Sequence, residues 1–404
     1  MIGLKRRWAQ ACIGTEKCGK AIHQIRIQLL IGLLSSLLLF SATLVFYFTA
    51  KNGLGQFFLS ILTVIPLSIL IRIAREDLVV RFQLDNHEVA AGLTNAIFGN
   101  SIEICFAIVA VAQNEALVAQ TSLTGAVLSN CLLILGTCFL CGGFQNGVRT
   151  YPVVMARDKA QLLVLSLASI VLPTVFKLSA QAKTESGLPE VSRSSAIVLF
   201  LVFSFYVVYE YRRHAISTPP SVMLGLASAG AVSSAPVLDA FKDVNLQELR
   251  SQSLEHSGKE AKLPIVVNLC ILFVSLALTA FVSLLVVQSI EAPHTAIGMS
   301  KSFVGLVVIP SIYGCAEQTV TAARSRAENI DWIIEIAIDS SIRVTLFVLP
   351  LAVLVGWVAG DDSMSLFFDA FQVTILGLVV LLVNYIMHTG SSHWYGKMLL
   401  LRFS

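Results

Sequence analysis

The sequence predicts an all-α polytopic membrane protein with about ten transmembrane helices. Its 404 residues are 56% hydrophobic and only 13% charged, and the mean hydropathy is +0.79. Soluble domains carry about 25% charged residues, so this composition excludes an ordinary soluble domain and a disordered chain. The apolar residues form blocks of about 17–28, which is the length of helix that crosses a bilayer core. A net charge of +3 is too small to indicate a nucleic-acid partner.

The apolar blocks divide into two groups. The first block follows a basic N-terminal stretch and is too long to be the apolar region of a cleavable signal peptide. A long polar break at residues 212–262 predicts a cytosolic linker between two units. The predicted spans are residues 27–50, 57–74, 88–112, 116–142, 160–180, 195–211, 263–290, 301–323, 331–358 and 365–387.

Basic residues fix the expected orientation. With the N-terminus in the cytosol, most of the 28 Lys and Arg residues fall in or next to cytosolic segments, whereas Arg343 lies deep inside a predicted span. The positive-inside rule then places both termini in the cytosol. The expected division is residues 1–54 for the N-terminal tail and first span, 55–211 for the first repeat, 212–262 for the linker and 263–404 for the second repeat.

Two corresponding segments, one in each half, carry an intramembrane glutamate. Gly92–Glu103 (GLTNAIFGNSIE) and Gly305–Glu317 (GLVVIPSIYGCAE) both begin with Gly-Leu, contain small or helix-breaking residues and end with a carboxylate. The spans that carry them enter the membrane from opposite sides, so the two copies are inverted. Secondary transporters have this organisation, with a binding site near the bilayer midplane.

Glu103 and Glu317 predict a site for a cation and for protons. A carboxylate within the bilayer costs at least about 2.5 kcal/mol and persists where a cation or proton neutralises it. Ca²⁺ prefers oxygen ligands, which two carboxylates, side-chain oxygens and carbonyls freed at helix breaks can supply. When the ion leaves, two neighbouring carboxylates in a low dielectric favour protonation of one of them. The alternative that the glutamates only hydrogen-bond neighbouring helices stays open.

These segments resemble the Ca²⁺:H⁺ exchanger branch of the calcium/cation antiporter superfamily, which is found in fungal and plant vacuoles. AGLTNAIFGNSIEI (Ala91–Ile104) is similar to that family's first signature, GGLLNATFGNAxEL. KSFVGLVVIP (Lys301–Pro310) is similar to its KTFIGLILLP. The likeness covers residues 55–387. It implies two inverted repeats of the sodium/calcium exchanger type, preceded by a regulatory first span.

The resemblance also implies the activity and the site. The protein would be a secondary antiporter that exchanges cytosolic Ca²⁺ for lumenal H⁺ in the vacuolar membrane, with Ca²⁺ as its substrate and no cofactor. Its partners would be Ca²⁺, H⁺ and the lipid bilayer. We expect no nucleic-acid partner and predict no oligomeric state. The implied metal ligands, of which the two glutamates also carry the protons, are Glu103, Glu317, Asn100, Ser129 and Asn130.

A further motif concerns the entrance to the site. Ile65–Leu67 followed by Ala74–Asp77 resembles the family's IPLA…ATEE. This likeness implies that Glu76 and Asp77 lie near the cytosolic entrance.

The chain departs from the family pattern near the expected site. Aligned on the second signature, GNAAEH, it reads YGCAEQ, so that a Gly becomes Tyr313, an Asn becomes Gly314 and a His becomes Gln318. In the next span the family's GSSIQ becomes DSSIR, with Asp339 and Arg343 one helical turn apart. Two interpretations stay open: Arg343 forms an ion pair with Asp339, or it points at Glu317 as a built-in cation.

Two alternatives to Ca²⁺/H⁺ exchange stay open, because the chain departs from the family pattern at Tyr313, Gly314, Asp339 and Arg343. One is a non-transporting relative, and the other is an antiporter for Mn²⁺ or a monovalent cation. We do not expect an enzyme, because the sequence shows no Ser/His/Asp set, no H-E-x-x-H motif and no Gly-rich phosphate loop.

Overall fold

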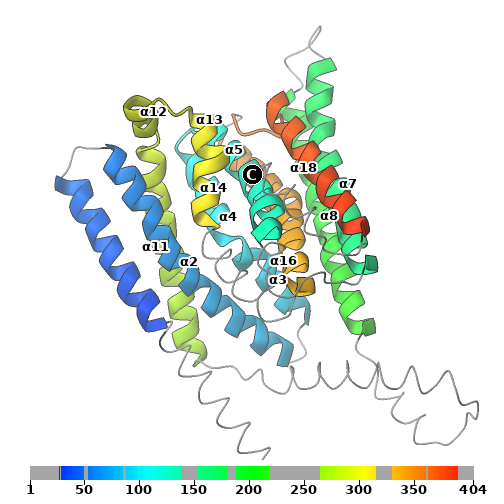
Figure 1. Ribbon diagram of the computed structural model, residues 1–404, viewed down its shortest axis with the longest axis horizontal. Helices are drawn as coiled ribbons and strands as arrows, with labels where there is room; N and C mark the ends of the chain where they lie inside the picture. The colour runs from blue at the N-terminus through cyan, green and yellow to red at the C-terminus, as the bar shows by residue number, and fades with distance from the viewer. Residues whose placement is uncertain are drawn as a thin grey trace, which may run out of the picture.

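A computed structural model gives the fold of the chain (Figure 1). Among the residues that it describes, eight helices are long and apolar enough to cross a membrane, a bent pair adds a ninth, and no strand occurs. The predicted all-α membrane fold is confirmed. Glu317, Gln318 and most of the predicted linker lie outside the described residues, which are 27, 29–49, 53–84, 88–137, 153–179, 188–217, 264–314, 330–360 and 363–389.

The first half of the chain supplies a peripheral helix and a set of packed helices. The peripheral helix, Leu29–Thr49, lies at the left edge of Figure 1 with most of its large apolar side chains exposed. The others are α2 (Gly53–Leu84), α3 (Glu88–Gly99), α4 (Ser101–Ala112), α5 (Ala116–Ser129) with the π-helical turn η1 (Asn130–Ile134), α7 (Val153–Ser179) and α8 (Leu188–Ser217).

The second half repeats the use of π-helical turns inside apolar helices. Two of its spans contain such a turn, and each is followed by a helix with Pro in its first turn. Its elements are α11 (Ile265–Gln288), α12 (Glu291–Ile297), α13 (Lys301–Phe303) with η3 (Val304–Val308) and α14 (Ile309–Tyr313), α16 (Ile330–Arg343) with η4 (Val344–Val348) and α17 (Leu349–Val358), and α18 (Ala370–Thr389).

The predicted span 88–112 is a broken helix. The chain bends by 55° between α3 and α4, and Asn100 at the bend has φ −119° and ψ 30°. Gly99 and Asn100 are weak helix formers, so an interruption costs least at this point. Broken backbone at membrane depth is tolerated only where protein or a water-filled cavity surrounds it. The break therefore lies just before Glu103, in the first turn of α4.

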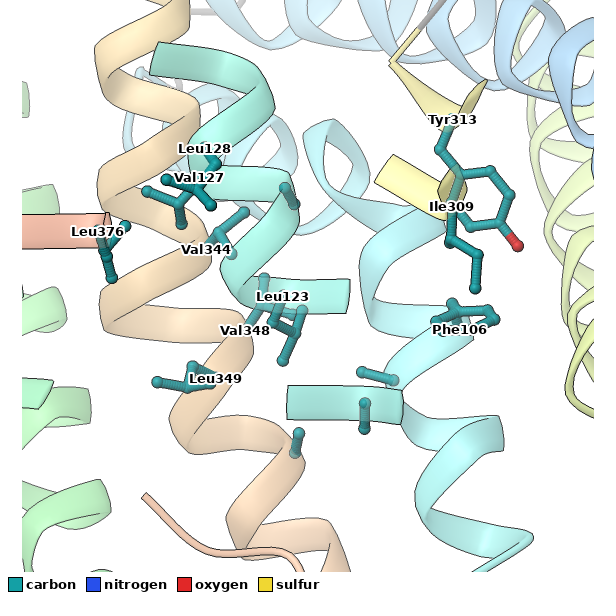
Figure 2. Packing of buried hydrophobic residues seen from close by; sticks show 14 of the residues in the cluster. Phe106, Leu123, Val127, Leu128, Ile309, Tyr313, Val344, Val348, Leu349 and Leu376 are labelled. Carbon is teal, nitrogen blue, oxygen red and sulfur yellow. The ribbon is translucent and has the colours of Figure 1, made fainter. Parts of the chain in front are cut away.

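Helix α5 occupies the centre of the bundle. Almost all of the residues in the apolar helix Ala116–Thr137 are buried. It packs against α4 of its own half and against η3, α14, η4 and α18 of the other half. Leu123, Val127 and Leu128 of this helix lie close to residues of η4 and α17 (Figure 2).

Two glycines allow the halves to approach closely. A Cβ atom on Gly125 of α5 would meet the backbone oxygen of Leu306, and one on Gly305 of η3 would meet the hydroxyl group of Thr121. Small residues at helix crossings bring backbones into contact, which is how membrane helices associate without a hydrophobic driving force. The two halves thus interlock through reciprocal glycines.

Several helices are longer than their apolar cores predict. Helix α2 extends ten residues beyond the predicted end at residue 74, to Leu84. Its last turns mix apolar and charged residues and carry the ion pairs Arg72–Glu76 and Arg81–Asp77, both at i, i+4 spacing. Such pairs stabilise the helix, so hydropathy alone underestimates its length.

The central helices of the two halves carry their π-helical turns at matching points. The segments GAVLSN (Gly125–Asn130) and DSSIR (Asp339–Arg343) correspond in sequence. In the first half α5 ends at Ser129 and η1 follows, and in the second half α16 ends at Arg343 and η4 follows. Single π-helical turns occur frequently at functional sites. This matched placement supports the inverted repeat.

Candidate cation site

A cavity of about 40 Å³ lies between the two halves, beside the break between α3 and α4. A water molecule needs about 10–15 Å³, so this cavity has room for an ion or a few water molecules. Arg72 and Arg75 of α2 and Tyr313 of α14 line it together with α3, α4 and α5. The other polar side chains that line the cavity are those of Ser68, Ser101, Glu103, Ser122, Ser129 and Asn130.

Glu103 lies in the first turn of α4, where the helix restarts after the bend at Asn100. Its side chain lines the cavity and is partly exposed. The N-terminus of a helix carries a partial positive charge, which favours an ionised carboxylate there. Glu103 therefore brings its carboxyl group to the cavity at the positive end of α4.

Ser129 and Asn130 add neutral oxygen atoms. The hydroxyl oxygen of Ser129 is buried and finds no hydrogen-bond partner among the described residues. An unpaired buried hydroxyl is costly, and a bound cation would satisfy it. Asn130 donates from Nδ2 to the hydroxyl oxygen of Ser340 over 3.0 Å. Its amide oxygen, the atom that binds metal ions, takes no part in that bond.

Asn100 lies behind the cavity instead of lining it. Its side chain is almost fully buried, at 1% exposed, and Oδ1 accepts a hydrogen bond of 2.9 Å from the Ser340 hydroxyl group. In this arrangement Asn100 holds the break in place, and its side-chain oxygen is already engaged. Of the predicted ligands, the structure brings Glu103, Ser129 and Asn130 to one cavity.

The side of the cavity formed by α2 is more basic than predicted. Glu76 pairs with Arg72 over 3.3 Å, and Asp77 pairs with Arg81 over 3.1 Å. Arg72 and Arg75 line the cavity, whereas Glu76 and Asp77 do not. The prediction from sequence missed the two arginines, although their spacing from Ser68 and Ile71 places all four on one face of α2.

Tyr313 and Gly314 alter one wall of the cavity. Tyr313 is buried, and its ring meets the ring of Phe106 edge to face at 5.7 Å between centroids (Figure 2). The phenol ring thus occupies space beside Glu103 in which a glycine would leave room. Gly314 offers no side-chain oxygen to the cavity that it lines.

Asp339 pairs with Lys159, so the interpretation that it pairs with Arg343 is wrong. Lys159 Nζ donates to Asp339 Oδ2 over 2.7 Å, and the Tyr206 hydroxyl group donates to Oδ1 over 3.1 Å. The Lys159 side chain is only 3% exposed. Helix α7 begins at Val153, earlier than the predicted residue 160, and Lys159 therefore lies in the helix and not in a cytosolic loop.

Arg343 is buried in the bundle, with 8% of its surface exposed. Its Nε atom has no hydrogen-bond partner among the described residues. Arg343 does not line the cavity, although Ser340, one turn earlier in α16, contacts Asn100 and Asn130. The second interpretation, in which Arg343 points at Glu317, stays a prediction because Glu317 lies outside the described residues.

An ion pair joins the halves at the opposite end of the bundle from Arg72. Lys301 Nζ lies 3.0 Å from Glu115 Oε1 and 2.6 Å from Glu291 Oε1. Glu115 precedes α5, whereas Lys301 and Glu291 begin α13 and α12, near the top of Figure 1. The contact between Lys301 and Glu115 holds the two halves together at that end of the bundle. Across the described residues, no group of three His, Cys, Asp or Glu side chains forms a resident metal site.

Comparison with known proteins identifies the family. The sequence profile of the family described as "Sodium/calcium exchanger protein" matches residues 52–212 and 267–403, which is more than half of the chain. The protein belongs to this exchanger family. Members of the family are transporters, which agrees with a polytopic fold that holds a carboxylate in a cavity between its two halves.

Individual relatives of this exchanger agree in sequence and in fold. It is 29% identical over 399 residues to a "Vacuolar calcium ion transporter" of Schizosaccharomyces pombe, covering 95% of this chain and 87% of the relative. It is 28% identical over 345 residues to a "Ca(2+)/H(+) antiporter" of Synechocystis, covering 85% and 87%. The solved structure described as "Structure of native YfkE" matches with a TM-score of 0.71 at 21% identity, covering 92% and 97%. That match shows the fold alone.

Proposed function

We propose that this protein is a secondary antiporter that exchanges cytosolic Ca²⁺ for lumenal H⁺ across an organelle membrane. The observation that carries the proposal is the cavity between the two halves. It brings together the carboxylate of Glu103 and the hydroxyl group of Ser129, which has no hydrogen-bond partner among the described residues. The relatives named as a vacuolar calcium ion transporter and a calcium/proton antiporter support this choice of ions.

The chemistry follows from the competition of Ca²⁺ and H⁺ for one carboxylate. An ionised Glu103 attracts Ca²⁺, while Ser129 and Asn130 replace part of the ion's hydration shell. Protonation of Glu103 removes the charge and releases the ion. A more acidic lumen favours the protonated form of Glu103 on that side. The proton gradient therefore drives Ca²⁺ from the cytosol into the lumen. Glu317, the counterpart of Glu103 in the inverted repeat, supplies the second carboxylate in this proposal.

Exchange also requires alternating access to the cavity. Arg72 and Arg75 mark the end of the bundle that we assign to the cytosol, and the Lys301 ion pairs mark the lumenal end. Both chain termini lie in the cytosol under this orientation, and the vacuolar membrane is the proposed location. Ca²⁺ is the substrate, and we propose that the exchange chemistry needs no cofactor.

The alternatives are less well supported. The similar relatives bear the names of calcium transporters and antiporters, which does not favour a non-transporting relative or a carrier restricted to Mn²⁺ or monovalent cations. Tyr313 narrows the cavity, and Gly314 offers no side-chain ligand. Glu103, Ser129 and Asn130 nevertheless meet there.

Proton-driven uptake tests the proposal directly. Purified protein is reconstituted into liposomes that are acidic inside, and entry of radioactive calcium is followed after Ca²⁺ is added outside. We expect uptake that stops when a protonophore dissipates the pH gradient. Uptake that is insensitive to the protonophore, or none above protein-free liposomes, would refute Ca²⁺/H⁺ exchange. Competition by Mn²⁺, Na⁺ and K⁺ in the same liposomes measures selectivity.

A further inference from the structure

A buried arginine close to the cation site forms no ion pair with the described residues. Arg343 is 8% exposed, and within the same part of the chain no acceptor reaches its Nε atom. The ion pairs that the described residues form do not include Arg343. A guanidinium group cannot be deprotonated in a protein, so its charge persists inside the bundle.

The nearest acidic residue on the same helix is already neutralised. Asp339 is one turn from Arg343, but it accepts hydrogen bonds from Lys159 at 2.7 Å and Tyr206 at 3.1 Å. The Lys159–Asp339 pair has no net charge. Within the described part of the bundle, Arg343 therefore adds a positive charge that no carboxylate pairs with directly.

Arg343 is also placed close to the cavity by two independent relationships. It is the last residue of α16 before η4, as Ser129 is the last residue of α5 before η1, so the two residues correspond in the inverted repeat. Ser340, three residues earlier, hydrogen-bonds Asn130, which lines the cavity. Three residues of helix span only about 4.5 Å along the axis.

We infer that Arg343 is a specificity-determining residue whose fixed positive charge makes the emptied cation site one unit less negative and weakens its affinity for Ca²⁺. This inference rests on the proposed function. The interaction energy scales with the charge of the ion, so a divalent cation loses twice as much as a monovalent one. Even at about 15 Å and an effective dielectric of about 20, Coulomb's law gives more than a tenfold loss of affinity for a divalent ion.

The test is equilibrium binding of Ca²⁺ to the purified full chain, with Na⁺ as a monovalent competitor. In Arg343→Gln the dissociation constant for Ca²⁺ is expected to fall by at least tenfold, and that for Na⁺ by the square root of that factor. Arg343→Lys, which keeps the charge, is expected to restore the wild-type selectivity. Arg157→Gln removes an exposed arginine and serves as the matched control, because solvent and salt screen a surface charge.

The outcomes separate this inference from the proposed function. If wild type binds Ca²⁺, Glu103→Gln does not, and Arg343→Gln binds within twofold of wild type, the inference about Arg343 is wrong and the site assignment stands. If Glu103→Gln binds Ca²⁺ as wild type does, the proposed function fails instead. A parallel change in Ca²⁺ and Na⁺ affinity would indicate a structural role and would also overturn the inference. If Arg343→Gln does not fold, Arg343→Met, with an apolar side chain suited to a buried position, is measured by the same criteria.

Discussion

Ser340 donates its hydroxyl hydrogen to Asn100 Oδ1 over 2.9 Å and thereby ties α16 of the second half to the helix break of the first. The same hydroxyl oxygen accepts from Asn130 Nδ2 over 3.0 Å. One buried hydroxyl group thus links the bend that orients Glu103 to the π-helical turn that follows Ser129. This link couples the geometry of the cation site to the contact between the two halves.

Removal of that hydroxyl group is expected to impair both stability and transport. In Ser340→Ala, two buried amide side chains lose a partner, at a cost of about 1–3 kcal/mol for each unsatisfied group. We expect a lower melting temperature of the purified protein and at least a tenfold loss of Ca²⁺ uptake. Ser341→Ala is the matched control, because Ser341 contacts Cys131 at 3.4 Å and takes no part in the link. Equal effects of the two substitutions on uptake would contradict the role of Ser340.

The close approach of the two halves at Gly125 predicts that a larger residue there lowers the stability of the protein. In Gly125→Ala the new methyl group meets the backbone oxygen of Leu306, which cannot rotate away as a side chain could. Overpacking of this kind costs about 1–3 kcal/mol or more, so we expect reduced thermal stability and separation of the helices. Gly377→Ala in α18 is the control, since nothing lies within 4 Å of its Cβ position. Thermal unfolding of both variants in detergent compares them, and an equally stable Gly125→Ala protein would contradict the close approach.

The buried ion pair predicts a distinctive double-mutant result. Asp339→Asn leaves the Lys159 ammonium group buried without its carboxylate, which costs about 3–5 kcal/mol. Replacement of both partners, as in Lys159→Met with Asp339→Leu, removes both charges and is expected to recover most of that stability. Chemical or thermal unfolding of Lys159→Met, Asp339→Leu and the double variant that combines them measures the coupling. Additive losses would show that the two side chains do not interact.

Local sequence signals predict the helices and the first carboxylate, because they depend on neighbouring residues. Hydropathy locates the spans, and Gly99 with Asn100 indicates where the helix carrying Glu103 is interrupted. The charged residues near the end of α2 obscure its full length: the helix extends to Leu84, and its i, i+4 ion pairs stabilise those turns.

Contacts between distant residues explain most of what the sequence did not predict. Lys159 and Asp339 are 180 residues apart, and Asn100 and Ser340 are 240 apart. No periodicity within one helix reports such a pair. Asp339 has an attractive i, i+4 partner in Arg343, and only the tertiary arrangement brings the ammonium group of α7 to it instead.

The most direct test of the proposed exchange concerns Glu103 itself. Proton-driven Ca²⁺ uptake is measured in liposomes that contain equal amounts of wild-type protein, Glu103→Gln or Glu190→Gln, where Glu190 is an exposed carboxylate in the first turn of α8. We predict that Glu103→Gln reduces uptake to the level of protein-free liposomes, while Glu190→Gln retains the wild-type rate. Uptake by Glu103→Gln at the wild-type rate would contradict the claim that this carboxylate holds Ca²⁺ and H⁺ in turn.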